Sequence, residues 1–308
     1  MLWNFIRSET YRATRLKCFY ILPVIMLAAT FLVGMIVMRM DLAGMLGYTQ
    51  QDLQELGELG NSVEGYQRSF EVGFNTGLDM SRNTIENGGS PELKMFGIGL
   101  CYYEDVPEIF HQNISSLDQL ILVAVFAGMF MGEIFTTGND RNLLISTKHR
   151  GLLLAARYIV FAGYMLILHV LRFFFSAFSV LCLGESVKWN IDRSFIMYFI
   201  ITYFLTVAFG YVLCALAYVT RSKAATVAVG VSLALGVLSM AISLVNYIVN
   251  RNFNTHFDLA RYTLSQNLTT LGLQSDGDFV LKTVVVGVVY FVAAIAVGAV
   301  TAKNRDIG

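Results

Sequence analysis

Residues 132–157 read GEIFTTGNDRNLLISTKHRGLLLAAR, a polar stretch between two long apolar runs. The stretch carries four basic side chains against two acidic ones. It is too short to form a domain, and its charges are costly inside the hydrocarbon core of a membrane. Basic residues in short loops between membrane spans are retained on the cytoplasmic side. The pattern therefore predicts a short cytoplasmic helix that joins two spans and contacts a soluble partner.

The composition of the whole chain agrees with a membrane location. Of the 308 residues, 56% are hydrophobic and only 14% are charged, whereas soluble proteins carry about 25% charged residues. The formal net charge is zero, so no overall positive field points to a nucleic-acid partner. We predict an all-α polytopic membrane protein.

Six apolar runs are long enough to cross a bilayer. A hydrocarbon core of about 30 Å needs about 20 residues of helix. The first run is longer than the roughly 7–15 apolar residues of a signal peptide, so we expect it to stay uncleaved. The six transmembrane helices are predicted at residues 18–38, 117–137, 152–183, 194–219, 224–249 and 279–302.

The segments between these runs differ in length and charge. Residues 1–17 form a predicted amphipathic helix that lies in the membrane interface; the alternative is that they extend the first span. A large extracytoplasmic region is expected at 39–116, with a helix near 52–59 and a break at 87–91. A second extracytoplasmic loop is expected at 250–278, with a short helix around 259–267. Residues 220–223 read as a tight basic turn.

The distribution of charge sets the predicted orientation. If both termini, the 132–157 stretch and the 220–223 turn are cytoplasmic, the cytoplasmic side holds twelve Lys or Arg and four acids. The other side then holds nine basic and eighteen acidic residues. This asymmetry follows the excess of basic residues found on the cytoplasmic side. We therefore expect a multi-pass protein with both termini in the cytoplasm.

A G-x-x-x-G pattern, Gly128 and Gly132, lies in the second predicted span. Two glycines four residues apart share a helix face and allow a neighbouring backbone to approach closely. Apolar segments also contain such pairs by chance, so a packing role and a chance occurrence remain open at this stage.

Motifs for catalysis and for cofactor binding are absent from the sequence. There is no G-x-x-x-x-G-K-[ST] loop to hold ATP phosphates and no H-E-x-x-H zinc motif. The four histidines are far apart and lack the spacing of metal ligands. We expect a protein that is not an enzyme and binds no cofactor or metal of its own.

Two places within the predicted spans carry ionisable groups. His169 and Arg172 are three residues apart and so share a helix face; a charge tolerated inside a span is a candidate functional site. The alternative is that Arg172 reaches the headgroups or pairs with an acid such as Glu185 or Asp192. Glu133, at the inner end of its span, either is a solvated or lipid-interface carboxylate paired with Arg141 or Arg150, or sets the angle between the span and the cytoplasmic helix.

Three stretches resemble the permease subunits of ABC-2 type exporters, which include bacterial drug, antimicrobial-peptide and lantibiotic-immunity permeases. The opening MLWNFIRSETYRATRLKCFYILPVIM, residues 1–26, is similar to the short helix and first span of that family. In that family an acid is followed by a polar turn, a basic residue, a Leu-Leu pair and an arginine. The stretch at 132–160 resembles this order. The C-terminal segment AKNRDIG, residues 302–308, is like the basic tail of that family. The proline usual near the hinge arginine is missing here, where 146–149 read STKH.

The resemblance implies a single permease domain over residues 1–308 in a bacterial plasma membrane. Residues 1–17 would be an elbow helix, and 138–151 a coupling helix entering a groove on a separate cytoplasmic ABC ATPase, which binds the ATP. A second permease subunit, identical or different, would complete the dimer. The cargo exported would be amphipathic or hydrophobic: a peptide, a drug or a lipid-like molecule. The residues that the resemblance assigns to coupling are Glu133, Asn139, Arg141, Leu143, Leu144, Lys148, Arg150 and Arg157.

Two other functions are compatible with this sequence. A secondary transporter would place charges and broken helices near the middle of the bilayer, and the predicted spans are nearly free of acids. A membrane sensor or anchor would use residues 39–116 to bind a ligand outside the cell.

Overall fold

The computed structural model describes most of the apolar part of the chain. The described residues are 2–39, 94–95, 98–99, 106–115, 117–136, 150–182, 188–238, 241–242, 245–246, 249, 259–273, 275 and 277–303. The predicted coupling helix at 138–151 therefore lies outside them, apart from its last two residues. The helix and break expected at 52–59 and 87–91 also lie outside the described residues.

Helices make up nearly all of this described structure. In an apolar environment a helix satisfies its own backbone N–H and C=O groups, so long apolar runs fold this way. The long helices are α1 (Leu2–Arg15), α2 (Lys17–Arg39), α8 (Leu117–Thr136), α10 (Arg150–Cys182), α11 (Arg193–Thr220), α12 (Lys223–Ala234) and α15 (Gly277–Lys303). The shorter elements are α7 (Val106–Ser115), the 3-10 turn η2 (Ala260–Tyr262), α14 (Leu264–Thr270), and the antiparallel strands β1 (Lys94–Met95) and β2 (Ile98–Gly99).

Four of these helices, α8, α10, α11 and α15, are long and apolar enough to cross a membrane. The bent pair α1 and α2 makes a fifth if the two are counted together. The chain is therefore a helical protein of the multi-pass membrane type. The predicted total of six spans is not reached by single continuous helices within the described residues.

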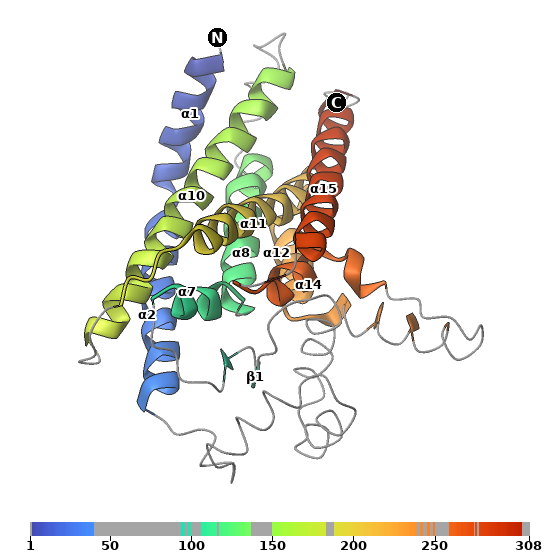
Figure 1. Cartoon of the computed structure of the whole chain (residues 1–308). Coiled ribbons are helices and arrows are strands. Elements are labelled where there is room, and N and C mark those ends of the chain that lie inside the picture. Colours follow the sequence, from blue (N-terminus) through green and yellow to red (C-terminus); the bar gives the residue numbers. More distant parts are fainter. Residues whose placement is uncertain are drawn as a thin grey trace.

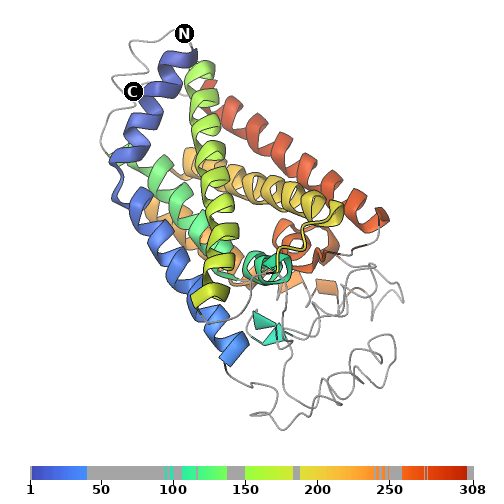
Figure 2. The ribbon, with the colours of Figure 1, turned by 60° about the vertical axis from the view of Figure 1, so that its left-hand side comes forward.

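The first two helices are separate elements. The chain bends by 62° between α1 and the first part of α2, Lys17–Leu32, and the break falls at Leu16. Residues 2–15 therefore do not continue α2 as a straight extension. Figure 2 shows α1 and α2 along one side of the molecule, where both pack against α10.

The core of the bundle is built around α8 and α11. In the apolar stretches of α8 and α11, 67% of the residues are buried. The corresponding share for α15 is 22%, which places α15 at the periphery. Helix α11 packs against α15 and α8, and α12 packs against α8. The start of α1, the start of α10 and the end of α15 lie at the same end of the molecule (Figures 1 and 2).

The basic turn predicted at 220–223 is confirmed. Helix α11 ends at Thr220, and Arg221 adopts the left-handed conformation with φ of 54°. The side chain of Ser222 then caps α12 by accepting a hydrogen bond of 3.2 Å from the backbone N–H of Ala225. A left-handed residue after one helix and a serine cap before the next are common means of reversing a chain.

The span predicted at 224–249 is not one continuous helix. Helix α12 ends at Ala234, and Gly236 takes φ of 76°, which glycine adopts without steric cost. The residues described after this turn, 237–238, 241–242, 245–246 and 249, are helical again. A predominantly apolar run hides such a turn, because its hydropathy does not change there.

Two short helices lie buried at the end of the bundle opposite the termini (Figure 1). Every residue of α7 except Glu108 is buried, although the sequence placed this segment within a large extracytoplasmic region. Helix α14 is likewise buried and is in contact with α7. The helix expected around 259–267 is thus present, but it begins at Leu264 after a 3-10 turn. Each of the two short helices is tied to a long helix by a polar side chain: Asn113 donates to the hydroxyl of Ser176 on α10, and Asn267 accepts from the hydroxyl of Thr283 on α15.

The packing role of the G-x-x-x-G pattern is confirmed. A Cβ atom at Gly132 would lie 2.2 Å from Cγ and 2.8 Å from Cα of Lys223. One at Gly128 would lie 2.4 Å from a methyl carbon of Val227. The two glycines therefore set the closeness of α8 and α12, as small residues do between membrane helices.

We expect Gly132→Ala to destabilise the protein by about 1–3 kcal/mol, because the added methyl group forces two helix backbones apart. The matched control is Gly163→Ala in α10, where an added Cβ meets nothing within 4 Å. The difference in stability between the two variants is measured by thermal unfolding in detergent, with the loss of monodisperse protein as the readout. Equal midpoints for the two variants would contradict the close approach.

Candidate functional site

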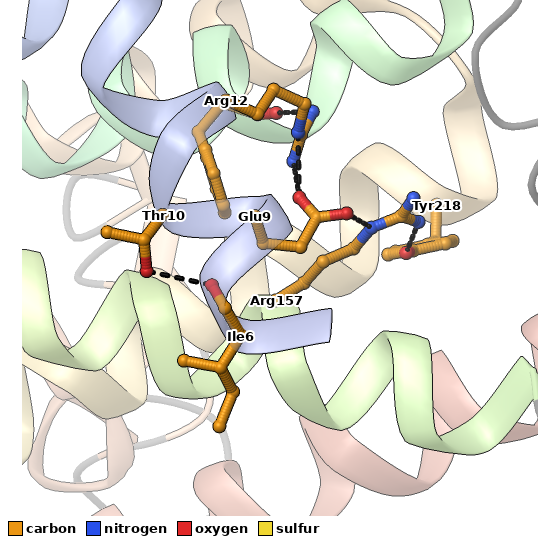
Figure 3. A network of polar contacts seen from close by, with 7 residues as sticks. Ile6, Glu9, Thr10, Arg12, Arg157 and Tyr218 are labelled. Carbon is orange, nitrogen blue, oxygen red and sulfur yellow. Dashed lines mark hydrogen bonds and ion pairs between the residues drawn. The ribbon is translucent and has the colours of Figure 1, made fainter. Parts of the chain in front are cut away.

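A buried ion network lies close to the end of the bundle that carries the termini. At its centre is Glu9 of α1, which is 2% exposed. One carboxylate oxygen, Oε2, accepts a hydrogen bond of 2.7 Å from Nε of Arg12, and the other, Oε1, accepts one of 3.2 Å from Nε of Arg157. Figure 3 shows the carboxylate held between the two guanidinium groups. Burial of this acid is therefore compensated by two opposite charges.

The network joins four helices. Arg157 comes from the second turn of α10, and its Nη1 also donates to the hydroxyl oxygen of Tyr218 on α11 (Figure 3). Arg12 donates through Nη1 to the backbone oxygen of Phe130 on α8, at 3.1 Å. Its guanidinium also lies 4.6 Å from the centre of the Phe130 ring. A displacement of α10 at Arg157 must therefore be shared by α1 and α11, or else the ion pair breaks.

The charges in this network are asymmetric. Two guanidinium groups surround a single carboxylate, and the side chains of Arg157 and Glu9 are each 3% exposed. Removing one partner of a buried pair leaves the other charge uncompensated, which costs several kcal/mol. The arrangement holds helices in place, and it contains no nucleophile next to a general base.

A second buried network lies between α7, α8 and α10. Arg172 of α10 is fully buried and donates through Nη2 to Asp118 at 2.7 Å and through Nη1 to the backbone oxygen of Asn113 at 3.1 Å. Asp118 lies in the first turn of α8, and Asn113 lies in the last turn of α7. A cation at a helix C-terminus and an anion at a helix N-terminus both oppose the helix dipole favourably. Arg172 thus fastens the junction of α7 and α8 to α10.

The expected partners of Arg172 are corrected by this geometry. Asp192 instead caps α11 by accepting a hydrogen bond of 2.7 Å from the backbone N–H of Phe195. Glu185 lies outside the described residues. The expectation that an acid neutralises Arg172 is confirmed, but the acid is Asp118.

His169 lies on the same helix as Arg172 and is also fully buried. Its Nε2 is 3.2 Å from the backbone oxygen of Phe199 and 3.4 Å from the hydroxyl of Thr202 on α11. The ring also packs edge-on against Phe110 of α7. His169 therefore joins α10 to α11 and α7.

The predicted coupling residues are only partly described. Glu133 is half-buried on α8, Arg150 is the first residue of α10, and Arg157 is in the buried network. The structure thus brings Arg157 to Glu9, a pairing that the sequence did not predict. Asn139, Arg141, Leu143, Leu144 and Lys148 lie outside the described residues.

Sequence reasoning missed Glu9, Arg12, Tyr218 and Asp118 as members of these networks. One signal was present, because Glu9 is the single acid of α1 in a segment otherwise rich in arginine. Its charge is compensated both from within α1, by Arg12, and from α10, by Arg157. Among the described residues, no group of three or more His, Cys, Asp or Glu side chains gathers to hold a metal ion.

Comparison of the chain with models of protein families and with curated proteins found no match.

Proposed function

We propose that this chain is the membrane-spanning permease subunit of an ATP-driven exporter of the ABC-2 type. ATP would be bound and hydrolysed by a separate cytoplasmic ATPase, and a second permease subunit would complete the pathway. The cargo is an amphipathic or hydrophobic molecule such as a peptide, a drug or a lipid. Six spans are expected in this proposal, with α12 and the residues that follow its turn together forming the fifth.

The observation that carries the proposal is the ion pair between Glu9 and Arg157. Arg157 lies seven residues after Arg150, the first residue of α10, and α10 directly follows the basic stretch of residues 137–149. A partner that moves this stretch also moves the first turns of α10. Through Arg157 that motion reaches α1 and α11, and through Arg12 it reaches α8.

Such a connection is what an ATP-driven transporter needs. A partner changes the balance between two access states only if it binds those states differently. Packed helices respond to small shifts by moving as rigid bodies. Because the network joins α1, α8, α10 and α11, a movement of residues 137–149 shifts these four helices together.

A secondary transporter is the second candidate, and the buried pair of Arg172 and Asp118 is the observation in its favour. Transporters of that class hold ionisable groups at broken helices. Asp118, however, lies in the first turn of α8 rather than in its middle. Its side chain is 28% exposed, which fits a helix junction better than a coupling site for ions.

We expect the chain, purified in mild detergent from its native membrane, to carry a stoichiometric P-loop ATPase that mass spectrometry identifies. Arg141→Glu should weaken retention of this ATPase at least about tenfold, because removing one partner of a buried charge pair in an interface costs about 2–5 kcal/mol. ATP hydrolysis by the purified complex, reconstituted in vesicles, should fall in parallel.

The matched control is Arg193→Glu, an exposed arginine at the start of α11 that the proposed orientation places outside the cell. It should retain the ATPase fully. Retention and hydrolysis that Arg141→Glu leaves unchanged would contradict the role of residues 138–151. Absence of any ATPase, in a preparation that preserves other membrane complexes, would refute the exporter and favour the secondary transporter.

A further inference from the structure

One face of α1 alternates aromatic and basic side chains. Trp3, Arg7, Tyr11 and Arg15 follow one another at a spacing of four residues, which places them along one side of a helix. All four are exposed, with Trp3 at 74% and Tyr11 at 58%. We call these four residues the outer stripe of α1.

The outer stripe carries positive charge that its own helix does not neutralise. Glu9 is the single acid of α1, and it points inward to Arg12 and Arg157. Lys17 follows the stripe at the start of α2 and is also exposed. The outward side of α1 is therefore cationic, while the inward side belongs to the buried ion network.

One arginine of the stripe is held in place by its neighbour. The guanidinium of Arg15 lies 4.5 Å from the centre of the Tyr11 ring, and its Nη2 donates to the Tyr11 hydroxyl oxygen. A guanidinium has five N–H donors in a planar fork, so this bond leaves donors for another acceptor. Holding the side chain in advance reduces the entropy lost when an anion binds.

The exposed residues change in character just beyond the stripe. After Lys17, the exposed residues of α2 are aromatic or aliphatic and include Tyr20, Ile21, Val24 and Ile25. A surface of this kind fits the hydrocarbon core, so the boundary of that core falls near Lys17. Because α1 bends away from α2 by 62°, its length of about 21 Å rises only about 10 Å along the direction of α2. Helix α1 thus stays near the headgroup layer.

We propose that the outer stripe of α1 binds the headgroups of anionic phospholipids in the leaflet on the side of the termini. Arginine recognises phosphate oxygens by paired hydrogen bonds. Tryptophan and tyrosine favour the depth of the headgroups, and anionic leaflets attract basic segments next to a span. The proposal depends on the membrane location and not on the ATPase, so it can fail or hold independently of the exporter.

Trp3 itself supplies the measurement. The chain has two tryptophans, and Trp189→Phe leaves Trp3 as the sole reporter. The Trp189→Phe variant is placed in nanodiscs that contain equal amounts of phosphatidylcholine and phosphatidylglycerol. In one sample the acyl chains of the first lipid carry bromine, and in the other sample those of the second lipid do. Brominated phosphatidylglycerol should quench Trp3 about fivefold more strongly, the enrichment expected for one basic side chain near a charged surface. Higher salt should reduce the difference without any further substitution.

The double substitution Arg7→Gln and Arg15→Gln should abolish this preference, whereas Arg221→Gln, an exposed arginine off the stripe, should keep it. Equal quenching by both brominated lipids in the protein with intact arginines would overturn the proposal. Quenching by neither lipid would also overturn it, since Trp3 would then face water or an acidic protein partner. A preference that survives the double substitution would show that other residues select the lipid.

Discussion

Glu9→Gln is expected to be the most destabilising single substitution in the network of Glu9, Arg12 and Arg157. It leaves the buried guanidinium of Arg157 and the partly buried one of Arg12 without their carboxylate. Unpairing a buried charge costs about 3–5 kcal/mol. Arg157→Met should cost somewhat less, because Arg12 still neutralises Glu9 at 2.7 Å. The midpoint of thermal unfolding in detergent measures both effects.

Two further variants distinguish loss of the ion pair between Glu9 and Arg157 from other causes of instability. Arg15→Met removes an exposed arginine from the same helix and should leave the midpoint nearly unchanged. The double variant Glu9→Gln with Arg157→Met should be more stable than the sum of the single effects predicts, since one unpaired charge is removed together with its partner. Strictly additive effects would show that Glu9 and Arg157 do not interact.

The second large effect is expected for Arg172→Met. This substitution leaves Asp118 without its partner and removes the donor to the backbone oxygen of Asn113. Because Asp118 is partly exposed, the loss should lie near the lower end of the range for buried pairs, about 3 kcal/mol. Limited proteolysis near the junction of α7 and α8, together with thermal unfolding, reports the change.

Asp118→Asn tests the same pair from the other side and should cost at least as much, because it leaves the fully buried Arg172 without its carboxylate. Arg172→Lys keeps the charge but cannot reach both acceptors with the planar fork of arginine, so it should fall between Arg172→Met and the unsubstituted protein. If Arg172→Met instead unfolds at the normal temperature yet abolishes transport, Arg172 acts on the cargo or an ion. The structural role assigned to it would then be wrong.

Most of the helix bounds were predictable from the pattern of apolar residues. The predicted spans 117–137, 194–219 and 279–302 correspond to α8, α11 and α15 within two residues at each end. The physical reason is local, since a membrane helix needs a certain length of apolar sequence and polar residues end it. The break of α12 at Gly236 was missed, because a single glycine in an apolar run is compatible with a helix as well as with a turn.

The candidate site was predictable only in part, as Arg157 illustrates. Its position after the basic stretch made it a candidate, yet nothing near it in the chain identified Glu9, which is 148 residues away. The same holds for Arg172, whose sequence neighbours included plausible acids but whose partner is Asp118 on another helix.

Sequence alone thus established the helical membrane class, the approximate ends of most spans, and the unusual presence of charges such as Arg172 within them. These properties depend on the solvent that each segment tolerates, which is a matter of local composition. Which charges neutralise one another, and that α7 is buried against the spans, depended on how the helices pack. A buried charge pairs with whichever opposite charge the bundle brings within reach, and that distance is a property of the assembled helices.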